Sequence, residues 1–415
     1  MIPARWRERL RAALLKPLPT TPLDPERVFG PQPTALYLHV PFCAHKCAYC
    51  SFNTFRRPPT RMRDYVTAVE REIASHATRP ELGAVEVSSI YVGGGTPTHL
   101  PADDMARLLD ALTCSFRLRP GVQVTLEANP DSLGPEKLER YRSHGVNRIS
   151  LGVQTFDPEQ LRLLGRGHGV AEIYDALRRL GEVGLSEVSL DLMFGLPGQS
   201  LAGFADDLAK AIDTGVPHVS LFPLSHRPGT ALSRRRARRR PLWRMYRHAL
   251  DTLAAAGFRQ YTTEDFTRGA PCAYQLDLWQ PPPKDCLGIG PGALSSWRGT
   301  NWHNLGDLDA YIAACSAERA PIAGGGRPSV HQQMHDHIHL AVRTLRLDRA
   351  QFEARFGVPA EHVLGPLPAI TRALGLTRRD ERGDLELTAR GRYLASRVWS
   401  EFILAKLSEA AESGA

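Results

Sequence analysis

Apolar residues along the chain occur either in short runs or in longer segments where they recur every three or four positions. The segment 102-ADDMARLLDALTCSF-116 has the second pattern, which is typical of a helix with one buried face. The short runs, typical of buried strands, are 36-LYLHV-40, 88-SSIYVGG-94, 122-VQVTLEA-128, 147-NRISLGV-153, 187-EVSLDLMFG-195 and 217-PHVSLFPL-224. Because strands that alternate with helices form parallel sheets, we predict an α/β fold with a partial barrel of six βα units and chemistry at the carboxyl ends of its strands.

The alternation weakens at both ends of the chain. Residues 1–34 are rich in Pro and Arg, and we expect an N-terminal extension there. The core would occupy residues 35–300 and include a glycine-rich turn, 287-LGIGPGALSSW-297. Residues 301–415 would form a small α+β accessory domain resembling a winged helix, since a helical pattern is followed by a short strand and a second helix.

The accessory domain contains four histidines in one helical segment, 331-HQQMHDHIH-339. They cannot all lie on one helix face. We interpret the segment as a surface helix, with a metal or heme site as the alternative.

The composition is that of an ordinary globular protein. Hydrophobic residues make up 42% of the 415 residues, charged residues make up 23%, and no apolar run reaches the ~18 residues of a membrane span. The start of the chain lacks the apolar core of a secretory signal, so we expect a cytoplasmic protein with no membrane partner. The net charge of +8 is concentrated in 234-RRRARRR-240, which predicts a mobile surface segment or an attraction for anions. Aromatic residues do not interleave with basic ones, which argues against a nucleic-acid partner.

Three of the seven cysteines lie within eight residues, as Cys43, Cys47 and Cys50. Structural zinc usually takes four ligands in two separated pairs, and no second C-x-x-C pair exists here. Three thiolates on one loop suit three irons of a [4Fe–4S] cluster and leave the fourth iron open to another ligand. Zinc or chance remains the alternative from spacing alone. The other four cysteines are scattered, and we expect them to be core residues.

Seven segments, taken in order, resemble the radical S-adenosylmethionine (SAM) superfamily. The resemblance is to the branch that contains oxygen-independent coproporphyrinogen III oxidase (HemN), its heme-chaperone relatives (HemW) and HemN-like class C methyltransferases. The segments are 36-LYLHVPFC-43, 93-GGGTPTHL-100, 127-EANPDSL-133, 147-NRISLGVQTFD-157, 164-LGRGH-168, 191-DLMFGLPGQS-200 and 287-LGIGPGALS-295. The resemblance implies a radical SAM barrel whose reduced cluster cleaves SAM, with an electron donor such as flavodoxin or ferredoxin.

The resemblance also implies which residues bind SAM. Tyr37 and Glu127 match positions beside the cluster-bound SAM, where a carboxylate can accept hydrogen bonds. The glycines before Thr96 would let the backbone approach the ligands closely. Positions that match contacts of a second SAM molecule, or that shape its pocket, are Tyr49, Gly94, Gly95, Thr96, Gln154, Arg166, Asp191, Ser225 and Leu294.

Two departures from the branch shape the functional hypothesis. Phe52 stands where the oxidase carries a further cysteine, and Tyr274 stands where the chaperones carry a histidine linked to heme binding. We therefore expect a radical SAM methyltransferase or cyclopropanase that transfers a methyl or methylene group to an unsaturated carbon of a small natural-product substrate. Glu264 would serve as its base, with Asp265 as an alternative. A HemW-type heme chaperone or an oxidase-like protein is the alternative hypothesis.

Overall fold

The computed structural model describes residues 34–79, 85–225, 229–233 and 239–395. The expected N-terminal extension lies outside the described residues except for Thr34, and so does most of the arginine run 234–240. Among the described residues, no helix is long and apolar enough to cross a membrane.

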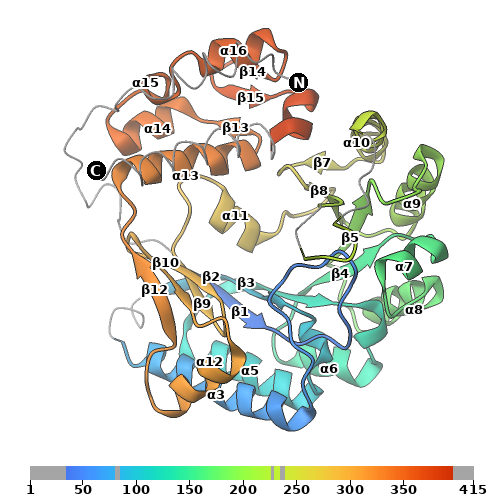
Figure 1. The fold of residues 1–415 in the computed structure, drawn as a ribbon, viewed down its shortest axis with the longest axis vertical. Coiled ribbons are helices and arrows are strands. Elements are labelled where there is room, and N and C mark those ends of the chain that lie inside the picture. The colour runs from blue at the N-terminus through green and yellow to red at the C-terminus, as the bar shows by residue number, and fades with distance from the viewer. Residues whose placement is uncertain (1–33, 80–84, 226–228, 234–238, 396–415) are drawn as a thin grey trace.

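Six parallel strands form the centre of the molecule. They are β1 (Thr34–Val40), β2 (Glu86–Gly94), β3 (Arg117–Ala128), β4 (Arg148–Gln154), β5 (Val188–Phe194) and β6 (His218–Pro223), and each pairs with its sequence neighbour. One face of this sheet is covered by helices (Figure 1). They are α3 (Pro59–Ala77), α5 (Ala102–Ser115), α6 (Pro135–Ser143), α7 (Pro158–Leu164), α8 (Val170–Glu182), α9 (Leu201–Asp213) and α10 (Arg239–Ala255). One continuous hydrophobic core lies between the two layers. The predicted α/β class is confirmed.

The same sheet extends beyond the six strands on both edges. On one edge, β9 (Cys286–Ile289) runs parallel to β1 and leads into an antiparallel meander of β10 (Leu294–Trp297), β11 (Thr300–Asn304) and β12 (Ile322–Gly326). On the other edge, β8 (Asp265–Thr267) pairs antiparallel with β6, and β7 (Arg259–Gln260) pairs with β8. The glycine-rich turn joins β9 to β10. It needs Gly288, because a Cβ there would lie 2.2 Å from the carbonyl oxygen of Leu294.

A second unit lies above the open side of the barrel in Figure 1. It contains α13 (Val330–Arg343), β13 (Arg346–Leu347), α14 (Arg349–Phe356), α15 (Ala360–Leu364), α16 (Leu367–Ala373), β14 (Thr377–Arg379) and β15 (Leu385–Leu387). Its three strands form a separate antiparallel sheet, and its apolar side chains form a core of their own. The expected domain boundary after residue 300 falls at the first residue of β11, which belongs to the main sheet. We propose that the accessory domain begins near residue 327.

The histidine-rich segment belongs to α13, where its four histidines differ in burial. His337 is 2% exposed and lies edge-on to the rings of Phe352 and Phe356. Burial lowers the pKa of His337 to about 3, and Arg355 acts in the same direction. Within the described part of the chain, no histidines, cysteines or carboxylates converge to hold a metal ion. His337 is therefore a core residue of the accessory domain and not a surface residue.

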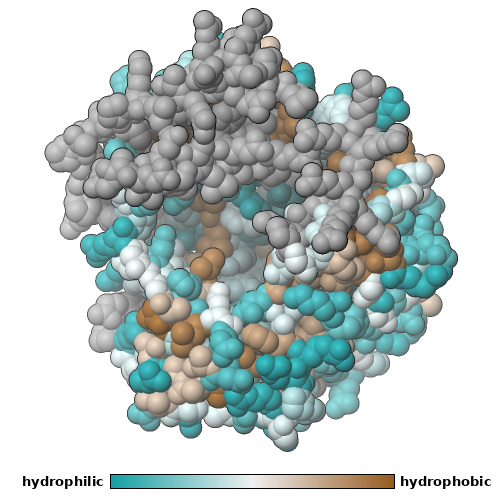
Figure 2. Space-filling view, viewed as in Figure 1, coloured by the Kyte–Doolittle hydropathy of each residue, from teal (hydrophilic) through white to brown (hydrophobic). Residues whose placement is uncertain are grey.

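The helix α11 (Ala273–Trp279) lies between the barrel and the accessory domain (Figure 1). The guanidinium of Arg343, at the end of α13, lies 3.9 Å from the centre of the Trp279 ring. The carbonyl oxygen of Arg343 accepts a 2.9 Å hydrogen bond from the backbone N–H of Thr263. The two units are thus joined by directional contacts. On the face that Figure 2 shows, hydrophobic residues lie among hydrophilic ones.

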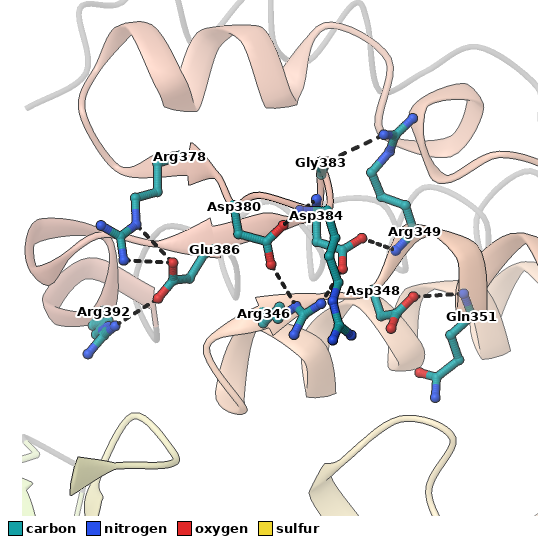
Figure 3. Close-up of polar contacts among 11 residues, drawn as sticks. Arg346, Asp348, Arg349, Gln351, Arg378, Asp380, Gly383, Asp384, Glu386 and Arg392 are labelled. Carbon is teal, nitrogen blue, oxygen red and sulfur yellow. Dashed lines mark hydrogen bonds and ion pairs between the residues drawn. The ribbon is translucent and has the colours of Figure 1, made fainter.

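The surface of the accessory sheet carries a network of ion pairs (Figure 3). Asp384 is 5% exposed, pairs with Arg346 at 2.5 Å and accepts a 3.0 Å hydrogen bond from the backbone N–H of Arg349. Glu386 lies between Arg378 and Arg392, at 2.8 and 3.3 Å. These contacts hold α14 against the strands.

We predict that Asp384→Ala lowers the free energy of unfolding of the accessory domain by about 1–3 kcal/mol, since charged hydrogen-bond partners are left without their acceptor. Burial alone would raise the pKa of Asp384, but its donors lower it below the usual value. The stabilisation should therefore be present above about pH 4 and be lost as the pH falls through the folded-state pKa. Hydrogen exchange of α14 and β15 would measure it. Glu381→Ala is the matched control, because Glu381 is exposed and forms no ion pair with a described residue. Equal effects of both variants would contradict the prediction.

Candidate iron–sulfur and SAM site

The cysteine loop leaves the carboxyl end of β1 and is fixed at several points. Phe42 and Phe55 form an isolated parallel bridge. The backbone N–H of Cys43 donates to the carbonyl of Phe55 at 3.2 Å, and that of Phe55 donates to Pro41 at 2.6 Å. Farther along the loop, the N–H of Ala48 donates to the carbonyl of Leu164 at 2.9 Å. These bonds hold the three thiols at the rim of the barrel.

Each of the three sulfur atoms has one polar neighbour. Thr96 Oγ1 lies 3.6 Å from Cys43 Sγ, Arg166 Nη1 donates to Cys47 Sγ at 3.4 Å, and the backbone N–H of Phe52 donates to Cys50 Sγ at 3.4 Å. These contacts fix the positions of the three sulfur atoms, whose thiolate form is the one that binds metal.

The three thiols fit a cluster better than a single metal ion. Among the described residues, no three groups of the ligand types, these cysteines included, converge closely enough to hold one ion. This separation suits a [4Fe–4S] cluster, which takes one thiolate on each of three irons, better than one zinc ion with all its ligands around it.

Gly95 lets the end of β2 approach the cysteine loop. A Cβ at this position would lie 2.6 Å from the carbonyl oxygen of Phe42 and 3.0 Å from Cys43 Sγ. The N–H of Gly95 also donates to Val40 at 2.9 Å, and the N–H of Thr96 donates to Phe42 at 2.8 Å. Only a residue without a side chain allows these contacts and a free thiol together.

A cavity of about 880 Å³ opens beside the cysteines at the carboxyl ends of the strands. Twelve of the site residues predicted from the sequence line it: Cys43, Cys47, Cys50, Tyr49, Gly94, Gly95, Thr96, Glu127, Gln154, Arg166, Asp191 and Ser225. The parallel sheet brings them together, because the segments that follow or end its strands meet at one edge.

Three predicted residues do not line this cavity. Tyr37 lies behind it, with its ring 6.3 Å from that of Tyr91 and 6.0 Å from that of Tyr274. Leu294 is 70% exposed on β10. Glu264 lies toward the accessory domain, 3.6 Å from Arg343, so its geometry does not support the role of a base in the cavity.

Several cavity residues were missed by the sequence argument. Asn129 belongs to the quoted segment 127-EANPDSL-133, and its Nδ2 donates to Thr96 Oγ1 at 3.1 Å. Its polar side chain after a strand was a usable signal. The others include His45, Tyr91, His99, Ser150, Ser220 and Gln275. Some of these, such as His99 and Ser150, also lie in quoted segments, but nothing in the sequence shows which side chains face the cavity.

Arg166 connects the cluster loop to the strand ends. Its guanidinium donates to Tyr49 Oη at 3.3 Å, to Asn129 Oδ1 at 2.6 Å and to the carbonyl of Gly152 at 2.6 Å. Nearby, Gln154 has a φ of 71°, which is unusual for a residue other than glycine. The β4–β5 register shifts between Gly152 and Gln154, so a bulge turns the Gln154 side chain at the cavity edge.

Two half-buried carboxylates form the acidic side of the cavity. Glu127 accepts hydrogen bonds from Tyr91 Oη at 2.8 Å and from the N–H of Gly94 at 3.1 Å. Burial raises the pKa of Glu127, and these two donors partly offset that effect. Burial, together with the nearby Glu127 and Asp265, raises the pKa of Asp191 to about 8. A cationic ligand with hydroxyl groups would find acceptors here.

Comparisons with known proteins identify the family. The family described as the radical SAM superfamily matches residues 37–211. The heme chaperone HemW of Bacillus subtilis is 30% identical over 88% of this chain and 98% of its own length. The chain belongs to the HemN/HemW-like branch of the radical SAM superfamily. Another relative, the anaerobilin synthase of Escherichia coli O157:H7, is 30% identical over 89% of this chain and 83% of its own length.

A solved structure shows the same fold. Coproporphyrinogen III oxidase (HemN) from Escherichia coli superimposes with a TM-score of 0.78, at 24% identity, over 91% of this chain and 92% of that one. As a radical SAM protein of this branch, the chain binds a [4Fe–4S] cluster and SAM, which confirms those two predictions. The second SAM molecule stays a prediction.

The expected C-methylation or cyclopropanation is wrong. The relatives above, which match most of the chain, carry the names of a heme chaperone and an anaerobilin synthase, and the superimposed structure is that of a coproporphyrinogen oxidase. The expectation rested on Phe52 and Tyr274. Phe52 is 65% exposed and contributes its backbone N–H to Cys50, while Tyr274 packs inside the barrel on Tyr91. Neither position carries information about methyl transfer.

We predict that Gly95→Ala prevents stable cluster assembly, because the added methyl group must displace either the Phe42 carbonyl or the Cys43 thiol. Iron and sulfide content after anaerobic reconstitution should fall severalfold. Gly181→Ala is the control, since a Cβ there meets nothing within 4 Å. A fully loaded Gly95→Ala protein would refute the proposed need for close approach.

We predict that Asp191→Asn stabilises the ligand-free protein at alkaline pH. The pKa of Asp191 rises from about 3.9 in the unfolded chain to about 8 in the folded one. The wild type therefore loses stability as the pH rises between these two values, and the asparagine variant should not. Denaturant unfolding at pH 5 and pH 9 would measure the difference, with the exposed Asp213→Asn as control. A pH-independent difference between variant and wild type would rule out this pKa shift.

Proposed function

We propose that this protein binds heme in the cavity beside its iron–sulfur site and acts as a heme chaperone. The relative named heme chaperone HemW matches over nearly its whole length, which supports the proposal. The main support for heme binding is the composition of the cavity lining, which combines apolar, cationic and imidazole groups.

The apolar side chains suit the face of a porphyrin ring. Phe52 and Phe222 line the cavity and are 65% and 38% exposed, which is unusual for phenylalanine unless it has a partner. Met193 lies in the same lining. A flat apolar ring that covers the two phenyl groups would remove them from water, which is favourable.

The basic side chains suit the carboxylates of heme. Lys46 and Lys137 both line the cavity. Lys137 Nζ donates to the carbonyls of Thr98 and Leu100 at 2.6 and 3.0 Å. An ammonium group has three donors, so one remains for a ligand. Lys46 Nζ donates to the carbonyl of Phe52 at 3.0 Å, which places its charge beside that exposed ring.

Two histidines of the cavity, His45 and His99, suit the heme iron, for which imidazole is a common ligand. His45 lies within the cysteine loop and packs over Gly167, where a Cβ would lie 2.4 Å from its Cε1. Asp131 Oδ2 lies 2.7 Å from the same point. No hydrogen bond or ion pair joins Asp131 to His45 in this structure, but both side chains lie at Gly167. Because a carboxylate near an imidazole can orient a metal-binding histidine, His45 is the better candidate.

In this proposal the cluster and SAM occupy a different part of the cavity from heme. When bound, the cluster supplies the reducing electron that SAM cleavage needs. The chain's own task is to hold the three thiolates, to offer Glu127 and Asp191 as acceptors for SAM and to position Thr96 and Gln154. Because these polar residues line the same cavity as Phe52 and His45, heme would lie beside SAM.

A second candidate is a radical enzyme that modifies a tetrapyrrole. The observation that favours it is that the residues matched to SAM contacts share one cavity with the apolar mouth, and a relative named anaerobilin synthase covers 89% of this chain. Both candidates need a reductant and a tetrapyrrole, and they differ in whether the tetrapyrrole is changed.

We predict stoichiometric heme binding by the purified protein, seen as a Soret band. His45→Ala should weaken binding about tenfold or more, and Asp131→Asn should weaken it less, because Asp131 acts through the imidazole. His303→Ala is the control, since His303 is exposed on β11 and outside the cavity.

The outcomes separate the candidates. Heme recovered unchanged after incubation with SAM and reductant supports the chaperone, and a modified tetrapyrrole supports the enzyme. Absence of stoichiometric binding, or binding that no cavity variant changes, would reject heme as the ligand of this cavity.

A further inference from the structure

A group of basic side chains lies on the surface next to the cysteine loop. Lys46, Arg56, Arg57 and Arg63 are all exposed, and we call them the basic surface. Within the described part of the chain, none of the four forms an ion pair with a carboxylate. Their charge is therefore not balanced by a carboxylate, and Arg56, Arg57 and Arg63 lie outside the cavity that Lys46 also lines. The basic surface is separate from the arginine run at 234–240.

Two acidic residues near the basic surface share one further arginine. Arg61 pairs with Asp64 at 3.0 Å and also contacts Asp309. The hydrogen bond from Arg61 lowers the pKa of Asp309, and the charge of Arg57 has a smaller effect in the same direction. The local balance of charge is thus positive, although both acids are exposed.

The basic surface is tied directly to a cysteine of the cluster site. Phe55, which precedes Arg56, accepts the 3.2 Å hydrogen bond from the N–H of Cys43 and donates the 2.6 Å bond to Pro41. The guanidinium of Arg57 lies over the Phe55 ring, 5.4 Å from its centre, and Arg57 Nη1 donates to the carbonyl of Arg56 at 3.2 Å. Phe55 thus connects Arg56 and Arg57 directly to Cys43, which is one of the three cysteines expected to bind iron.

An exposed apolar residue lies within the same loop. Phe52 is 65% exposed, its backbone N–H contacts Cys50 Sγ, and its carbonyl accepts from Lys46 Nζ at 3.0 Å. Ser51 and Asn53 on either side are also exposed. An apolar residue among polar and basic neighbours is consistent with a small, transient protein interface.

We infer that this surface is the docking site for an acidic protein that carries one electron at a time. The cluster must gain one electron from outside the chain, and the donor is oxidised by one electron as the cluster is reduced. Positive charge around the entry point would steer a negatively charged carrier toward it and raise the association rate. The link from Arg56 and Arg57 through Phe55 to Cys43 then places the carrier next to the loop that would hold the metal centre. The inference depends on the cluster and not on heme.

The double variant Arg56→Glu with Arg57→Glu tests the inference, with a reduced bacterial flavodoxin as the probe. Stopped-flow spectroscopy follows bleaching of the reconstituted cluster by flavodoxin. We expect the second-order rate constant to fall about tenfold or more at low ionic strength, with a smaller loss at high salt. Reduction by photoreduced deazaflavin, a small neutral donor, should be unchanged. Calorimetry with cluster-free protein should show weaker flavodoxin binding, which is a readout independent of the cluster.

The matched control is Arg119→Glu with Arg142→Glu, which makes the same change in formal charge. Arg119 and Arg142 are exposed. Arg119 lies at the amino end of β3 and Arg142 in the last turn of α6, which leads into the amino end of β4, away from the cysteine loop. Equal slowing by the two double variants would overturn the inference, because only total charge would then matter. A wild-type rate that does not depend on ionic strength would also overturn it. That second test remains valid even if the Arg56 and Arg57 substitutions disturb the loop, and the milder pair Arg56→Gln with Arg57→Gln should show an intermediate loss.

Discussion

The site depends on one half-buried cation, the guanidinium of Arg166. It bonds to four parts of the chain: Cys47, Tyr49, Asn129 and the carbonyl of Gly152. Burial alone would lower the pKa of Arg166, but the neighbouring Tyr49 and Cys47 raise it. A buried charge is stable only when it is paired and hydrogen-bonded. Arg166 therefore needs these acceptors, and its guanidinium in turn holds the cysteine loop against the ends of β3 and β4.

The cavity combines two sets of chemical groups from different parts of the chain. The strands contribute Glu127 and Asp191, with Asp265 nearby on β8, where it accepts from Ser220 and Thr262 at 2.6 Å each. The cysteine loop contributes His45, Lys46 and Phe52. The first set suits a cation with hydroxyl groups, and the second set suits an apolar ring with negative substituents. A single ligand of either kind would leave one set unmatched, which supports a cavity built for two different molecules.

The sequence predicted the features that depend on local pattern. The alternation of apolar runs and amphipathic segments was enough for the six parallel strands, and the segments after them supplied most of the cavity lining. It missed features set by distant pairing. Tyr37 was placed in the site by position alone, but a strand has two faces, and its stacking on Tyr274 depends on where α11 packs. Glu264 follows β7, yet its direction is set by Arg343 from another unit. His45 was visible in the sequence, but its closeness to Asp131 arises from the packing of two loops on Gly167.

The methyl-transfer hypothesis was wrong because it rested on the absence of two side chains that relatives carry at positions 52 and 274. At position 52 the cluster uses only the backbone N–H, which almost any residue can provide, so the side chain there is free to serve the ligand or the surface. At position 274 the ring is held 4.8 Å from Tyr91, and its hydroxyl lies 3.9 Å from Cys286, so this residue is fixed by packing in the barrel. A missing group can exclude a reaction that needs it, but it cannot select among the reactions that do not. The residues that can select are those whose side chains have no structural partner and face the cavity. Here these are Phe52 and Phe222 at its mouth, and both favour a large apolar ligand.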